Sequence, residues 1–160
     1  MKKILVPIDG SECSKLAIEK AKEIAKAFKS EVILLHVIDM PSFKVILNPG
    51  LASVTGSGAV GPVPPAALAS MEESRESIQE TAEKILESAK AQCIVLGDKV
   101  STVLLEGRPA DMIIEFIDAN KDIDLVVMGS HGMTGFRRFF IGSVTYKVAL
   151  SIDRPILIVR

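Results

Sequence analysis

The amino-acid sequence predicts a single α/β domain in which helices cover both faces of a doubly wound parallel sheet. Its 160 residues, nearly half of them hydrophobic, suit one domain with a sizeable core. The strand-like segments are near-continuous runs of valine, isoleucine and leucine, which is typical of strands buried on both faces. Amphipathic helical patterns separate these runs, as right-handed crossovers between parallel strands require.

Five apolar runs are expected to form the strands. In chain order they are residues 4–8, 32–37, 100–105, 125–128 and 156–159. In a doubly wound sheet, ligands bind beyond the carboxyl ends of the strands, where the winding direction changes. The residues directly after the runs are therefore candidate site residues, namely Asp9, residues 38–39 and residues 129–132.

Helical periodicity occupies the intervals between these runs. Three intervals carry apolar residues at helical spacing, namely residues 17–28, 78–89 and 110–117. Ser14 is a plausible N-cap for the first helix, and Pro109 suits the start of the third. A last helix is expected to begin near Ser143, and Pro155 prevents its continuation.

Residues 41–70 depart from this alternation and hold five prolines and four glycines. They are predicted to form a flexible insertion, with an ordered lid as the alternative. Within them, residues 56–61 match the dinucleotide pattern G-x-G-x-x-G. No strand precedes this match and prolines follow it, so it is interpreted as a chance occurrence. The phosphate-binding pattern G-x-x-x-x-G-K-[ST] does not occur in the sequence.

Charge and cysteine content exclude several classes of function. The net charge is −1 with acids and bases interspersed, so neither nucleic acid nor an anionic membrane surface is an expected partner. No apolar run approaches the roughly 20 residues of a membrane span, and the first run is too short for a signal sequence. Cys13 and Cys93 lack the spacing of a disulfide framework or zinc site. We expect a cytoplasmic protein with reduced cysteines.

A glycine-spaced segment near the C-terminus carries the strongest functional signal. Residues 129–132, with the sequence GSHG, follow an apolar run, and GSVT at residues 142–145 opens a helical pattern. Glycines let the main chain approach an anion, and the first N–H groups of a helix lack intrahelical partners. Arg137 and Arg138 add positive charge between the two parts. From spacing alone, two interpretations stay equally open. The segment binds phosphate, or its glycines are ordinary turn residues and Ser143 is only the N-cap of the following helix.

These residues carry a family resemblance. Gly129, Gly132, Gly142 and Ser143 match the pattern G-x2-G-x9-G-[ST]. Together with residues 4–11, 35–39, 106–109 and 154–159, they make the chain resemble the universal stress protein family along nearly its whole length, except in the insertion. The resemblance implies one domain over residues 1–160, a three-layer sandwich of the Rossmann-like adenine nucleotide alpha hydrolase type. It also implies a five-stranded parallel sheet of order 3-2-1-4-5.

The complete glycine motif makes the chain similar to the ATP-binding subclass of that family. The resemblance implies a cleft between the first and fourth strands, holding ATP with Mg²⁺ or Mn²⁺ bound mainly by the phosphates. The implied binding residues are Pro7, Ile8, Asp9, Val37, Met128, Gly129, Ser130, His131, Gly132, Gly142, Ser143, Val144 and Thr145. Many ATP-binding members carry threonine or valine where this chain has Ile8. No residue is assigned a catalytic or metal-ligating role.

Three polar residues admit two interpretations each. Asp9 is expected to bond ribose or contact a metal through water, with a turn acceptor as the alternative. His131 is expected to contact the ligand through its main chain, because a catalytic base would also need a nucleophile and an orienting acid. His36 is interpreted as a satisfied core or strand-end histidine.

The expected function is that of a nucleotide-responsive regulator of the stress response. The resemblance implies a homodimer through Ile156–Val159, whose four apolar residues lie at the edge of the implied sheet, and an edge covered internally is the alternative. One alternative is a slow ATP hydrolase or phosphotransferase, for which Asp9, Arg137 and Arg138 are the evident candidates. The other is a binder of AMP or a cyclic nucleotide, because a phosphate loop does not determine how many phosphates it holds.

Overall fold

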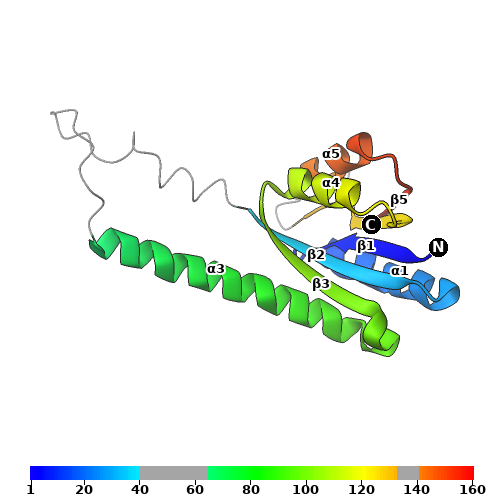
Figure 1. Cartoon of the computed structure of the whole chain (residues 1–160), viewed down its shortest axis with the longest axis horizontal. Helices are drawn as coiled ribbons and strands as arrows, with labels where there is room; N and C mark the ends of the chain where they lie inside the picture. Colours follow the sequence, from blue (N-terminus) through cyan, green and yellow to red (C-terminus); the bar gives the residue numbers. More distant parts are fainter. Residues whose placement is uncertain (40–64, 133–140) are drawn as a thin grey trace.

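The computed structural model describes residues 1–39, 65–132 and 141–160. These residues form a three-layer α/β sandwich (Figure 1). In chain order its elements are β1 (Lys3–Pro7), α1 (Glu12–Phe28), β2 (Glu31–Asp39), α3 (Pro65–Gln92), the 3-10 helix η1 (Ile94–Lys99), β3 (Val100–Gly107), α4 (Pro109–Ala119), β4 (Leu125–Gly129), α5 (Ser143–Ser151) and β5 (Ile156–Val159). All five predicted strands are therefore present.

The sheet is parallel throughout and has the order β3-β2-β1-β4-β5, which confirms the predicted order. Ile4 of β1 pairs with Val32 of β2 on one side and with Leu125 of β4 on the other. The chain winds outward from β1 to β3 and then returns to the other side of β1. The winding direction therefore changes between β1 and β4, where doubly wound sheets bind ligands.

Alternate residues of the strands pack into two separate cores. Ile4 and Val6 of β1 face α1 and α3, and Leu5 faces α4 and α5. All three side chains are fully buried. Strands covered on both faces need apolar residues at every position, which explains why their sequence shows continuous runs instead of alternation.

Helix α1 begins earlier than predicted. Its N-cap is Ser11, whose Oγ accepts a hydrogen bond from the main-chain N–H of Ser14 at 3.2 Å. Ser14, the predicted cap, is buried in the first turn and donates its own hydroxyl to the Ser11 carbonyl at 2.8 Å. The predicted cap was wrong because the apolar repeat begins later in the sequence than the helix itself does. Gly10, with φ of +83°, turns the chain into the helix directly after β1.

Helix α3 also begins earlier than predicted, at Pro65. Residues 65–70 are thus helical, and their assignment to the irregular insertion was wrong. Proline is well tolerated in the first turn of a helix, and the following AALA sequence has high helix propensity. The N-terminal part of α3 extends past the sheet (Figure 1). The rest of the predicted insertion, including the G-x-G-x-x-G match, lies outside the described residues.

The two cysteines are free. Cys93 lies in the core between the sheet and α3 and is only 1% exposed, and this burial raises the pKa of its thiol. Within the three described ranges, no helix has the length and apolar character needed to cross a bilayer.

Candidate functional site

A cavity of about 370 Å³ opens at the carboxyl edge of the sheet, where the winding direction changes. Its lining comes from β1, β2 and β4 with the residues that follow β1 and β4, and from α1, α4 and α5. The lining residues are Pro7, Ile8, Asp9, Ser14, Leu35, Val37, Asp39, Pro109, Ile113, Met128, Gly129, His131, Gly132, Gly142, Ser143, Val144 and Thr145.

All the predicted binding residues except Ser130 line this cavity. The structure therefore brings together segments that lie far apart in the sequence, although their contact with a ligand stays a prediction. Four lining residues were missed, namely Ser14, Leu35, Pro109 and Ile113. Asp39 was among the residues predicted after the second strand, and Ile38, predicted with it, is absent from the lining. Two signals pointed to some of them. Leu35 shares a strand face with Val37, and Pro109 and Ile113 are one turn apart in a helix that starts at the same sheet edge.

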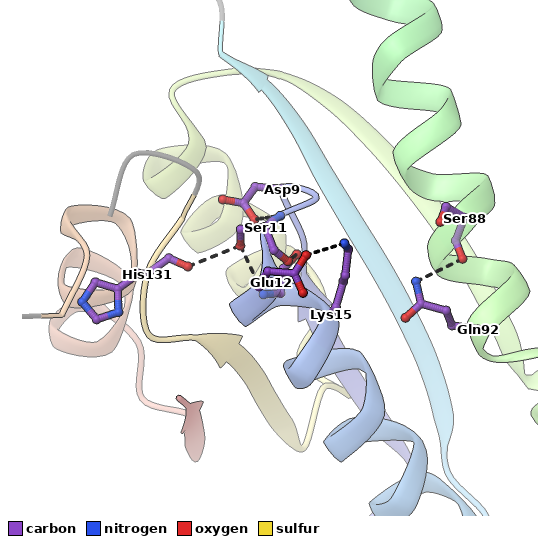
Figure 2. A network of polar contacts seen from close by, with 8 residues as sticks. Asp9, Ser11, Glu12, Lys15, Ser88, Gln92 and His131 are labelled. Atoms are coloured by element: carbon purple, nitrogen blue, oxygen red, sulfur yellow. Dashed lines mark hydrogen bonds and ion pairs between the residues drawn. The ribbon is translucent and has the colours of Figure 1, made fainter. Parts of the chain in front are cut away.

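The loops that follow β1 and β4 contact each other directly. Asp9 accepts a hydrogen bond from the main-chain N–H of Ser11 through Oδ1 at 3.0 Å, which is the turn-acceptor role considered for it. A Cβ atom added to Gly132 would lie 2.5 Å from Asp9 Oδ2. The Ser11 hydroxyl also donates to the main-chain carbonyl of His131 at 3.4 Å (Figure 2). Gly132 thus allows the glycine segment to approach the Asp9 carboxylate.

Gly129 is enclosed between two helices at the end of β4. A Cβ atom there would lie 2.8 Å from the main-chain carbonyl carbon of Cys13 in α1. On the other side, the hydroxyl of Thr145 in α5 donates to the Gly129 carbonyl at 2.8 Å. Gly142 adds a second link to α5, because its N–H donates to the Ser130 carbonyl at 2.8 Å. The position of the glycine segment is therefore set by the main chains that surround it.

Helix α5 directs its N-terminus into the cavity. Gly142 is the N-cap, and Ser143 is the first helical residue, so Ser143 is not the cap. The first intrahelical hydrogen bond runs from the Tyr146 N–H to the Gly142 carbonyl at 2.8 Å. The N–H groups of residues 143–145 precede this bond and have no acceptor within the helix. Together with the positive end of the helix dipole, they form a favourable place for an anion.

Ser130 and His131 have the spacing of a nucleophile and base, but Ser130 is inaccessible. Its Oγ lies 2.9 Å from His131 Nδ1. Ser130 is only 1% exposed, and its N–H donates to the Val159 carbonyl at 2.7 Å. Since Ser130 is absent from the cavity lining, the pair cannot attack a ligand held there. His131 Nε2 is buried and has no hydrogen-bond partner in the part of the chain that the structure describes.

His36 supports the end of β1 from the neighbouring strand. Its Nδ1 lies 2.8 Å from the main-chain carbonyl of Ile8. Because a carbonyl oxygen only accepts, Nδ1 is the donor in this bond. The adjacent Ile8 N–H donates to the Leu35 carbonyl at 2.8 Å. His36 is therefore a satisfied strand-end histidine, as interpreted from the sequence.

The described lining of the cavity is acidic. Asp9 and Asp39 are its carboxylates, and within residues 1–39, 65–132 and 141–160 no lysine or arginine lines it. Arg137 and Arg138 lie outside the described residues. Over the same ranges, no three histidine, cysteine, aspartate or glutamate residues gather as a metal-binding group. Among the described residues that line the cavity, it is therefore the main-chain N–H groups at the start of α5 that attract an anion.

Comparison with known proteins gives one consistent result. The model of the universal stress protein family matches residues 1–160. Universal stress protein MJ0531 from Methanocaldococcus jannaschii is 35% identical over 159 residues, covering 99% of this chain and 82% of that protein. The solved structure of MJ0577, a universal stress protein from the same organism, has a TM-score of 0.73 at 30% identity and covers 99% of this chain and 94% of that one. A universal stress protein from Archaeoglobus fulgidus, solved in complex with dAMP, shares the fold with a TM-score of 0.62 at 20% identity, covering 100% and 98% of the two chains.

Proposed function

The chain belongs to the universal stress protein family, and we propose that it binds ATP together with Mg²⁺ or Mn²⁺ and acts as a nucleotide-responsive regulator of the stress response. One observation carries this proposal. The loops after β1 and β4 and the N-terminus of α5 meet at a single cavity, at the edge of the sheet where ligands bind in doubly wound folds.

The two ends of the cavity suit the two ends of a nucleotide. Leu35, Val37, Ile113 and Met128 line the cavity and belong to one apolar cluster beneath α4, which is suited to a flat base. At the other end, the glycine segment and the first N–H groups of α5 are suited to phosphate. The volume of about 370 Å³ falls within the range of small-molecule sites. The dAMP-bound relative indicates that this fold accommodates an adenine nucleotide.

A divalent cation fits this arrangement through its charge. The phosphates of ATP would lie near the Asp9 carboxylate, which repels them. A cation bound mainly by the phosphates offsets that repulsion and needs no protein ligand cluster. Asp9 is placed to contact such a cation through water or to accept a hydrogen bond from ribose.

The described lining favours holding a nucleotide over cleaving it. Phosphoryl transfer needs an oriented attacking group and positive charge near the transferred phosphate. His131 Nδ1 lies 2.9 Å from the Ser130 hydroxyl, which is only 1% exposed and does not belong to the described lining, and no lysine or arginine of the described residues lines the cavity. We therefore favour regulation over ATP hydrolysis or phosphotransfer.

Calorimetric titration with ATP and Mg²⁺ tests this proposal, with ADP, AMP and cyclic AMP as competitors. We expect saturable binding of ATP and a rise in melting temperature, since ligand at 100 times its Kd stabilises the folded state by about 2.7 kcal/mol. Mass spectrometry of nucleotide released from freshly purified protein should detect ATP. Absence of both heat and thermal stabilisation would contradict the proposal. Preferential binding of AMP or cyclic AMP would support that alternative, and turnover above background would support an enzyme.

We further propose that two copies pair through β5. This strand is the edge of the sheet next to β4, and its four apolar residues are all half-buried. An apolar edge strand presents unpaired main-chain groups to another chain. The carbonyl of Pro155 accepts a hydrogen bond from the N–H of Val126 in β4 at 2.9 Å, and the carbonyl of Val159 accepts one at 2.7 Å from Ser130, directly after β4. In a parallel ladder, the main-chain groups of Ile156 and Ile158 therefore point away from β4.

Replacing Ile158 with proline should convert the dimer to a monomer with little loss of fold. The substitution removes an outward N–H and leaves the hydrogen bonds to β4 in place. Light scattering coupled to size-exclusion chromatography measures the change in mass. Ile158→Val is the control, because it keeps the N–H and should stay dimeric. A monomeric wild-type protein, or a dimeric Ile158→Pro variant, would contradict pairing through β5.

A further inference from the structure

Asp39 stands at the apolar end of the cavity. It is the last residue of β2 and lies opposite Gly107 of β3. Leu35, Val37 and Asp39 alternate along β2 and so share one face of the sheet, and all three line the cavity. The two apolar residues belong to the core beneath α4, whereas Asp39 is exposed. Its carboxylate is therefore at the rim of the space suited to a base.

The other carboxylate of the described lining has a different position. Asp9 lies beside Gly132, in the phosphate half, and its Oδ1 accepts a hydrogen bond from the Ser11 main chain. Among the described lining residues, Asp39 is thus the one ionisable side chain placed with the apolar residues of β2 and α4. A polar group at the edge of an apolar pocket determines orientation and specificity.

We propose that Asp39 selects the base of the bound nucleotide by accepting a hydrogen bond from its exocyclic amino group. This inference rests on the proposed function, which places a purine nucleotide in this cavity. An ionised carboxylate accepts hydrogen bonds and cannot donate them. The base edge that faces Asp39 must therefore present N–H donors, as the 6-amino group of adenine does. A purine without that group leaves the carboxylate without its partner.

Two triphosphates that differ only in this group test the inference. Purine riboside triphosphate carries hydrogen where ATP carries the 6-amino group. We expect the wild-type protein to bind ATP about tenfold more tightly, the effect of one hydrogen bond to a charged group. Asp39→Ala should reduce this affinity ratio to about one. Asp39→Asn keeps an uncharged acceptor and should give an intermediate ratio. Any general effect of charge on the phosphates changes both affinities equally and cancels in the ratio.

Asp98→Ala is the matched control. It removes the same charge from an exposed site in η1, which precedes β3 and lies at the opposite edge of the sheet. This control should keep the wild-type ratio, and melting curves without nucleotide show whether each variant is folded. If ATP binds but the ratio is about one in the wild type, or is unchanged by Asp39→Ala, the inference is overturned and the proposed function stands. If neither triphosphate binds the wild type, the proposed function fails and the inference fails with it.

Discussion

Replacing Gly132 with alanine should weaken ATP binding by about tenfold or more, with little change in the free energy of unfolding. The new Cβ would lie 2.5 Å from Asp9 Oδ2, so the carboxylate must move. The atom displaced is the end of a side chain and Gly132 is exposed, so the fold can accommodate the change. The site loses one positioned charged group, and a hydrogen bond to such a group accounts for about tenfold in affinity.

Gly142→Ala is the matched control for this prediction, because it changes another glycine of the same motif. Among the atoms of the described residues, the nearest to its Cβ would be the Ser130 carbonyl oxygen at 3.4 Å, so we expect a smaller loss of affinity. A double-mutant cycle with Asp9→Ala identifies the mechanism. If Gly132→Ala acts by displacing Asp9, it should cost little in the Asp9→Ala background. Additive losses would show that Gly132 acts independently of Asp9.

Replacing Gly129 with alanine should instead destabilise the fold, by about 3 kcal/mol, the upper end of overpacking costs in protein cores. The added Cβ would lie 2.8 Å from the carbonyl carbon of Cys13 and 2.9 Å from its oxygen. These are main-chain atoms in the first turn of α1, so no side-chain rotation relieves the contact. The end of β4 and the start of α1 must separate, and both border the cavity.

Urea denaturation measures this loss as a shift of the unfolding midpoint. Gly97→Ala is the control, because a Cβ at Gly97 meets no atom of the described residues within 4 Å. Its φ of +59° with ψ of −134° still makes alanine unfavourable there, at a cost of about 1–3 kcal/mol. The control therefore has backbone strain without a steric clash. A Gly129→Ala variant no less stable than Gly97→Ala would show that β4 and α1 separate easily.

The elements were predictable because their signals are local. Residues 125–128 and 156–159 are strands in the structure, and α4 begins at Pro109. The predicted helix starts were wrong where the local sequence is compatible with more than one structure. Ser11 and Ser14 are both acceptable caps, and only the exit of the chain from β1 through Gly10 selects Ser11. Pro65 suits a loop as well as the first turn of a helix.

The proposed phosphate end of the site was easier to predict from the sequence than the proposed base end. The proposed phosphate end was predicted from a glycine pattern in one stretch of chain, together with the resemblance that this pattern carries. The base end combines Leu35, Asp39, Pro109 and Ile113 from separate elements. No single stretch shows that combination. It depends on the register of β2 with β3 and on the way that α4 returns over the sheet.

By itself, the sequence determined the alternation of strands and helices, and it predicted the carboxyl edge as the place for a ligand and the glycine segment as its phosphate end. These follow from periodicity and turn chemistry, which act between residues close in the chain. Only the tertiary structure decided that Gly129 packs against Cys13, that Gly132 faces Asp9 and that Ser130 is buried. Steric contact and burial depend on which main chains are brought together by packing, and the sheet brings together segments that are distant in the sequence.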